Sequence, residues 1–122
     1  MFAVSYKEKA TNMSDKKKEP VVLNTKQKQY LKGLAHPLNP LVQIGKEGLS
    51  PGLLAMTREE LLRHELIKVK LSNNSGLDKV ATSEEIAEKT ESILVQLIGK
   101  TFVLYKENLK KPKDKRIYIP KG

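Results

Sequence analysis

A strand, a tight turn and a helix start follow one another without a spacer in residues 41–51, Leu-Val-Gln-Ile-Gly-Lys-Glu-Gly-Leu-Ser-Pro. The apolar run 41–44 predicts a short buried strand. Ser50 and Pro51 suit the N-cap and the first position of a helix. Glycine at 45 and 48 allows a sharp turn, because glycine has no Cβ and tolerates positive φ. A strand that leads directly into a helix predicts one unit of an α/β sheet.

The same turn admits two interpretations. The free N–H groups of a helix start favour an anion, and Lys46 adds a positive charge beside them, so a phosphate group is one natural ligand. Two glycines at this spacing also occur in an ordinary strand-to-helix connection that contains a left-handed residue. The turn alone does not decide between these interpretations.

The rest of the chain continues the alternation of helix and strand patterns. Helices are predicted over 25–35, from 51 to 64 or 65, and over 78–90; strands are predicted over 41–44, 66–71, 92–98 and 101–106. Gly99-Lys100 predicts a hairpin turn between the last two strands. The order α-β-α-β-α-β-β indicates an α/β fold, a single domain over 24–120 with a four-stranded mixed sheet and three helices.

Apolar spacing predicts which side chains each element buries. Strand 66–71 alternates, so Ile67, Val69 and Leu71 point to one face and two lysines to the other. The expected apolar positions of the three helices are Leu31, Leu34 and Ala35, then Leu53, Leu54, Leu61 and Leu62, then Val80, Ile86 and Ala87. Residues 107–116 predict a lysine-rich loop, and 117–119 a short strand or extended piece.

Residues 1–23 are expected to form a disordered basic tail, because they are polar and lack periodicity. Met13-Ser14-Asp15-Lys16 has the pattern of an ordinary protein start, which leaves Met1 and Met13 open as the first residue. Met1-Phe2-Ala3-Val4 is too short for a secretory hydrophobic region. No stretch reaches the roughly 20 apolar residues of a membrane span. With no cysteine in the chain, cytoplasm is the expected compartment.

The formal charge of +9 is unevenly distributed along the chain. Residues 24–70 hold eight Lys or Arg against four Asp or Glu, 71–105 three against five, and 106–122 seven against two. The basic charge therefore lies around the glycine turn and in the C-terminal segment. Such a balance favours polyanions, nucleic acid first and an anionic membrane surface second.

Enzymatic chemistry has little support in the sequence. His36 precedes a proline at a helix end and His64 lies beside an apolar stripe, so each is expected to be structural or capping rather than catalytic. Neither belongs to a metal-ligand pattern, and there is no nucleotide-hydrolysing P-loop. We therefore expect no catalytic residues, no metal, no cofactor and no small-molecule substrate.

Four blocks of sequence, in order, resemble the CRM domain, which bacteria carry alone as YhbY-type proteins. The blocks are Thr25-Lys-Gln-Lys-Gln-Tyr-Leu-Lys-Gly-Leu-Ala-His-Pro-Leu38, Val42-Gln-Ile-Gly-Lys-Glu-Gly-Leu49, His64-Glu-Leu-Ile-Lys-Val-Lys70 and Gln96-Leu-Ile-Gly-Lys-Thr-Phe-Val-Leu-Tyr105. The resemblance covers roughly residues 24–106. It implies an RNA-binding domain similar in fold to the C-terminal domain of bacterial translation initiation factor three.

The resemblance also implies where RNA binds. The family's GxxG loop corresponds to Gly45, Lys46, Glu47 and Gly48, and is compared with the loop of KH domains that clamps a nucleic-acid backbone. Glu47 departs from what a phosphate site favours, because its carboxylate opposes the phosphate charge. We therefore expect the RNA contacts to come mainly from the lysines of the first helix and of strand 66–71, which are Lys26, Lys28, Lys32, Lys68 and Lys70.

Stand-alone members of the family associate with precursors of the large ribosomal subunit. The resemblance therefore implies a protein that assists assembly of that subunit and binds ribosomal RNA. We expect it to be a monomer. A binder of transfer or small RNA, or a permanent ribosomal component, are the alternatives. Stacking on splayed bases could rest only on Tyr30, Tyr105, Tyr118 or Phe102, of which Phe102 is expected in the core, so shape and backbone recognition of structured RNA is expected.

Overall fold

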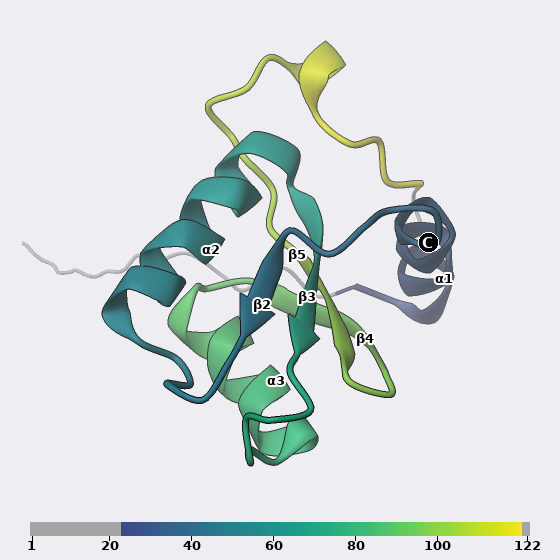
Figure 1. Ribbon diagram of the computed structural model, residues 1–122. Coiled ribbons are helices and arrows are strands. Elements are labelled where there is room, and N and C mark those ends of the chain that lie inside the picture. The colour runs from purple at the N-terminus through teal and green to yellow at the C-terminus, as the bar shows by residue number, and fades with distance from the viewer. Residues whose placement is uncertain (1–22, 121–122) are drawn as a thin grey trace, which may run out of the picture.

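The computed structural model describes residues 23–120 of the 122-residue chain, and in them seven helices and strands follow one another (Figure 1). They are α1 (Thr25–Ala35), β2 (Val42–Ile44), α2 (Pro51–His64), β3 (Leu66–Leu71), α3 (Lys79–Lys89), β4 (Ile93–Ile98) and β5 (Thr101–Tyr105). A single 3₁₀ turn, Lys113–Lys115, follows them. The predicted order α-β-α-β-α-β-β and the α/β class are confirmed, with boundaries that differ by one residue.

Local signals in the sequence account for the helix starts. The Leu53 N–H donates to the Ser50 hydroxyl at 3.2 Å, and Pro51 stands at the first position of α2, as predicted. Asn24 and Gln27 form a capping box at the start of α1, in which each side chain accepts from the other's backbone N–H. Asp78 caps α3, so this helix begins at Lys79.

The four strands form one mixed sheet in the order β2-β3-β5-β4. β2 and β3 are parallel and are joined by α2; β5 is antiparallel to both of its neighbours. The chain therefore crosses through α3 to the outer strand β4 and folds back to place β5 in the middle (Figure 1). The register between β4 and β5 shifts between Leu94 and Gln96.

Helices cover both faces of the sheet and create two cores. α2 and α3 pack on one face, over β3 residues that include Ile67, Val69 and Leu71, as the alternation predicted. α1 packs on the other face, where Leu31 and Ala35 meet Leu66, Val95, Val103 and Tyr105. Lys68 and Lys70 alternate with the first set along β3, so they lie on the α1 face of the sheet.

The predicted apolar faces of the helices are wrong at three positions. Leu34, Leu62 and Val80 are 39%, 51% and 47% exposed, so none of them is a core residue. The core uses small hydroxyl residues instead. Thr57 and Ser83 are fully buried and donate to the carbonyls of Leu53 and Val80, both at 2.8 Å. A short polar side chain can be buried in a helix when its hydroxyl bonds to the preceding turn.

Residues 106–120, here called the C-terminal strap, run from β5 over the end of α2 to α1 (Figure 1). Residues 117–119 form no strand, and Ile117 and Ile119 pack half-buried on the α1-side core. The Gln27 side-chain amide donates to the Pro120 carbonyl at 3.0 Å, which joins the strap to α1.

The predicted disordered tail lies outside the described residues except for Leu23, which is buried in the α1-side core. In the described part of the chain, no helix has the length and apolar character that crossing a membrane requires.

Candidate nucleic-acid interface

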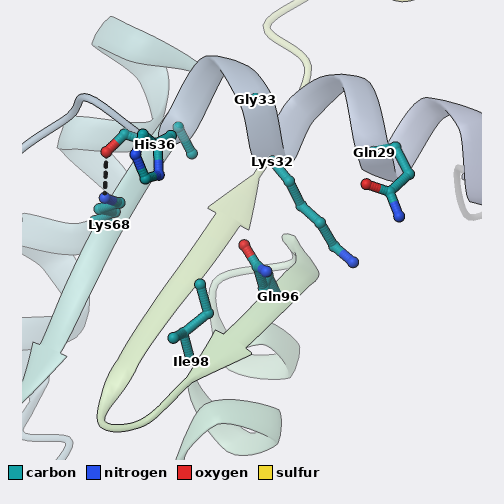
Figure 2. A pocket seen from close by; sticks show the side chains of 8 residues that line it. Gln29, Lys32, Gly33, His36, Lys68, Gln96 and Ile98 are labelled. Carbon is teal, nitrogen blue, oxygen red and sulfur yellow. Dashed lines mark hydrogen bonds between the residues drawn. The ribbon is translucent and has the colours of Figure 1, made fainter.

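An open groove of about 400 Å³ lies between α1 and the sheet (Figure 2). Four residues of α1 and its cap form one wall, and β3 and β4 form the other. The lining residues are Gln29, Lys32, Gly33, Ala35, His36, Lys68, Gln96 and Ile98. Figure 2 shows the Lys32 side chain reaching from the helix toward the sheet, and Gln96 pointing up from the sheet toward the helix.

Two of the predicted RNA-binding lysines, Lys32 and Lys68, line this one groove although 36 positions separate them in the sequence. The Lys68 ammonium donates to the His36 carbonyl at 3.0 Å. His36 is the C-cap of α1, where carbonyl groups without helical partners concentrate negative partial charge. Lys68 therefore both caps α1 and adds positive charge to the groove.

The other predicted lysines of this surface lie around the groove rather than in it. Lys28 is half-buried and Lys26 is exposed on α1, one turn or more before Lys32. Lys70 is exposed on β3, two residues beyond Lys68 on the same face, and its neighbour across the parallel pair is Gln43. The five lysines share the α1 side of the sheet, on which no other helix of residues 23–120 packs.

The glycine turn lies at the other end of β2. It follows the carboxyl end of that strand, whereas α1 precedes its amino end (Figure 1). The Gly48 N–H donates to the Gly45 carbonyl at 3.0 Å, and Gly48 has φ of 67°. Lys46 and Glu47 are both exposed at its tip. The predicted site residues therefore form two groups, the lysines beside α1 and the GxxG turn.

The aromatic side chains divide between core and surface. Phe102 is fully buried, as predicted, and Tyr105 is 2% exposed, so neither can stack on a base. Burial raises the pKa of Tyr105 to about 12, and the negative charges of Glu107 and Glu65 add to this effect against the opposing charge of Arg116. Tyr30 and Tyr118 are exposed and remain as stacking candidates.

Sequence reasoning did not single out the two glutamines, Gly33 and Ile98 as part of a site. Gln29 accompanies the lysines in the first helix and Gln96 alternates along its strand, but only tertiary packing brings them to one groove. The sequence offered one signal for this groove, which is the glycine inside the predicted first helix. Glycine weakens a helix, and the φ of Gly33 is not positive, so the backbone conformation does not require a glycine there.

The two histidines occupy surface positions. His36 is exposed at the end of α1, where its backbone N–H donates to the Lys32 carbonyl. The His64 ring lies 3.4 Å from the Glu60 carboxylate, and both residues belong to α2. Among residues 23–120 no three side chains of His, Asp or Glu gather as metal ligands would.

Comparison with known proteins identifies the family of the chain. The model of the CRS1 / YhbY (CRM) domain matches residues 23–106. A Haemophilus influenzae protein named RNA-binding protein is 42% identical over 99 residues, which cover 81% of this chain and 96% of the relative. The probable RNA-binding protein YqeI of Bacillus subtilis is 39% identical over 99 residues, with 81% and 100% covered.

A solved structure agrees in fold as well as in sequence. The solution structure of SAV1595 from Staphylococcus aureus, described as a hypothetical protein and a candidate RNA binder, matches with a TM-score of 0.67 and 40% identity. The match covers 81% of this chain and all of that one. A family match over more than half of the chain, with relatives of this identity and coverage, shows that the chain belongs to the CRS1 / YhbY (CRM) domain family.

Proposed function

We propose that this protein binds structured RNA of precursor large ribosomal subunits and assists their assembly in the cytoplasm, without catalysing a reaction. The observation that carries the proposal is that Lys32 and Lys68 line one open groove, in a chain whose relatives are named RNA-binding proteins. Several lysines on one side give an affinity dominated by phosphate contacts, which falls steeply with salt.

The GxxG turn enters this proposal as a second, weaker contact. Lys46 and Glu47 are both exposed, so the net charge of the turn is about zero. The N–H groups at the start of α2 still favour an anion. We infer that RNA lies across the α1 side and that the glycine turn contacts its backbone nearby. The protein is expected to act as a monomer.

Charge reversal at Lys28 tests the RNA surface directly. Lys28→Glu should weaken RNA binding about tenfold or more and flatten the dependence of log Kd on log salt, because one phosphate contact becomes repulsive. Lys79→Glu is the matched control, since Lys79 is an exposed lysine of α3 on the opposite side of the sheet. Equal losses in the two variants would mean that only net charge matters.

Lys68 needs a gentler change, because its ammonium also caps α1. Lys68→Gln keeps an amide donor near the His36 carbonyl while removing the charge. We expect reduced RNA affinity with a nearly unchanged urea midpoint. Affinity that is unchanged in both Lys28→Glu and Lys68→Gln would move the RNA site away from α1.

Crosslinking of bound RNA in cells, followed by sequencing of fractions from a sucrose gradient, tests the cellular role. Reads on large-subunit ribosomal RNA, in fractions lighter than mature subunits, are the expected result. Equal occupancy of mature subunits would indicate a permanent ribosomal component. Reads spread over transfer or small RNAs would overturn the assembly role while leaving RNA binding intact.

A further inference from the structure

We propose that the groove between α1 and the sheet holds one unpaired nucleotide of the bound RNA. The inference rests on the proposed RNA-binding function and adds a ligand class to it. The site is the groove lined by Gln29, Lys32, Gly33, His36, Gln96 and Ile98. Lys68 lies at its end, where its ammonium is bonded to the His36 carbonyl.

The groove has room for such a ligand because α1 lacks a side chain at Gly33. A Cβ built at Gly33 would meet no atom within 4 Å, so the helix wall is open at this point. Positive φ does not explain this glycine, since the positive-φ glycines are Gly48, Gly76 and Gly99. The volume of about 400 Å³ falls within the roughly 300–1,000 Å³ of small-molecule sites.

The polar groups of the groove suit the edge of a nucleobase. The amides of Gln29 and Gln96 each offer an acceptor oxygen and two donor hydrogens, the pattern that hydrogen-bonds the edge of a base. Neither side chain bonds to any other residue of 23–120, although Gln96 is half-buried. A half-buried amide with no partner among the described residues favours a polar ligand over an apolar one.

The remaining wall groups suit the other parts of a nucleotide. The Lys32 ammonium also bonds to no other side chain or carbonyl of 23–120, so it is available for a phosphate. Ile98 is 57% exposed and His36 is an exposed ring, and these offer contact to the flat face of a base.

An unpaired nucleotide fits this site better than a base pair. In a paired A-form helix, the major groove is too deep and narrow for side chains to read the bases, and the shallow minor groove shows base edges only while the bases stay stacked, whereas bulged or looped bases can be splayed out. Because this site lies between two protein walls, a base enters it only after leaving its helix.

The test fills the groove. Gly33→Leu places a side chain in the open space and improves helix propensity, so the variant should fold at least as well as the native chain. Ala81→Leu is the matched control, because Ala81 is also an exposed small residue of a helix, but it lies on α3, on the opposite side of the sheet. The probes are a paired RNA hairpin and the same hairpin with one bulged nucleotide, in four versions that differ in the bulged base.

The native chain and Ala81→Leu should bind at least one bulged hairpin about fivefold or more tightly than the paired one, as expected when one base is stacked. Gly33→Leu should lose this preference and keep the affinity for the paired hairpin. The double variant Gln29→Ala/Gln96→Ala should lose the preference in the same way, and it decides the matter if Gly33→Leu does not fold.

Each opposing result has a distinct meaning. Equal binding of bulged and paired RNA by the native chain, or a preference that survives in both variants, overturns the nucleotide site and leaves RNA binding standing. Failure of the native chain to bind either RNA overturns the proposed function itself, and the nucleotide site with it.

Discussion

Glu65 joins three parts of the chain through one side chain. It is the single residue between α2 and β3, is 1% exposed and has φ of 64°. Its carboxylate accepts the backbone N–H groups of Asn108 and Ile117, both at 2.7 Å, and its carbonyl accepts the Lys106 N–H at 2.8 Å. A non-glycine residue held at such a positive φ costs about 1–3 kcal/mol, which these charge-assisted bonds offset.

Replacing this carboxylate should loosen the C-terminal strap. In Glu65→Gln the amide oxygen can accept one N–H, but the NH₂ group faces the other, so we expect a loss of about 1–3 kcal/mol in the free energy of unfolding. Urea denaturation measures it, and faster hydrogen exchange of the Asn108 and Ile117 amides locates it. Glu59→Gln, which alters an exposed pair with Arg63, should change stability by less than about 0.5 kcal/mol.

Ionisation of the Tyr105 phenol is expected to lower the free energy of unfolding at high pH. The pKa of its phenol is raised from 10.0 to about 12 in the folded protein. The folded state therefore holds the phenol proton when the unfolded chain has lost it. The protonated phenol therefore adds roughly 2–3 kcal/mol to the free energy of unfolding. This contribution is fully present below pH 10 and is lost as the pH rises toward 12.

The variant Tyr105→Phe isolates this contribution from the titration of lysines, which both proteins share. Urea denaturation at several pH values from about 8 to 12 should show the native chain losing more stability than Tyr105→Phe above pH 10. Parallel curves for the two proteins would mean that the phenol ionises as readily in the folded state as in the unfolded chain.

At the scale of elements, the two glycines of the turn between β2 and α2 differ in whether the fold itself requires a glycine. Gly48 has φ of 67°, and a Cβ there would lie 3.5 Å from the Leu77 side chain. Gly45 has neither constraint, since a Cβ at that position meets nothing within 4 Å. The fold therefore explains the second glycine of the GxxG turn and does not explain the first.

This difference predicts that two alanine substitutions change the free energy of unfolding by different amounts. Gly48→Ala should lower the free energy of unfolding by about 1–2 kcal/mol, because an L-residue is strained at this φ. Gly45→Ala should leave stability within about 0.5 kcal/mol. If Gly45→Ala nevertheless weakens RNA binding, the turn approaches a ligand; thermal unfolding alongside RNA titration distinguishes the two effects.

At the scale of the whole molecule, charge is divided between the two sides of the sheet. The α1 side carries the lysines of α1 and β3, while α3, on the other side, exposes Glu84, Glu85 and Glu88. The strap adds further lysines at the end of α2. Because α3 also carries Lys79 and Lys89, its net charge is only slightly negative, and a polyanion is attracted to the α1 side in preference to α3.

Local sequence determined the elements of this protein. Ser50 and Pro51 specified the start of α2, the alternation of 66–71 specified β3 and its two faces, and four sequence blocks specified the family. These features depend on neighbours a few residues apart, whose spacing is visible in the chain.

Only the tertiary structure decided what those elements build. Contacts between distant residues place β5 inside the sheet and let Glu65 anchor the strap. The same kind of contact decides that Leu34, Leu62 and Val80 are exposed. The groove has the same origin, because Gln29 and Gln96 become neighbours only when α1 packs on the sheet. Side-chain packing across layers is not encoded in local periodicity, since many sequences with the same pattern could place these residues apart.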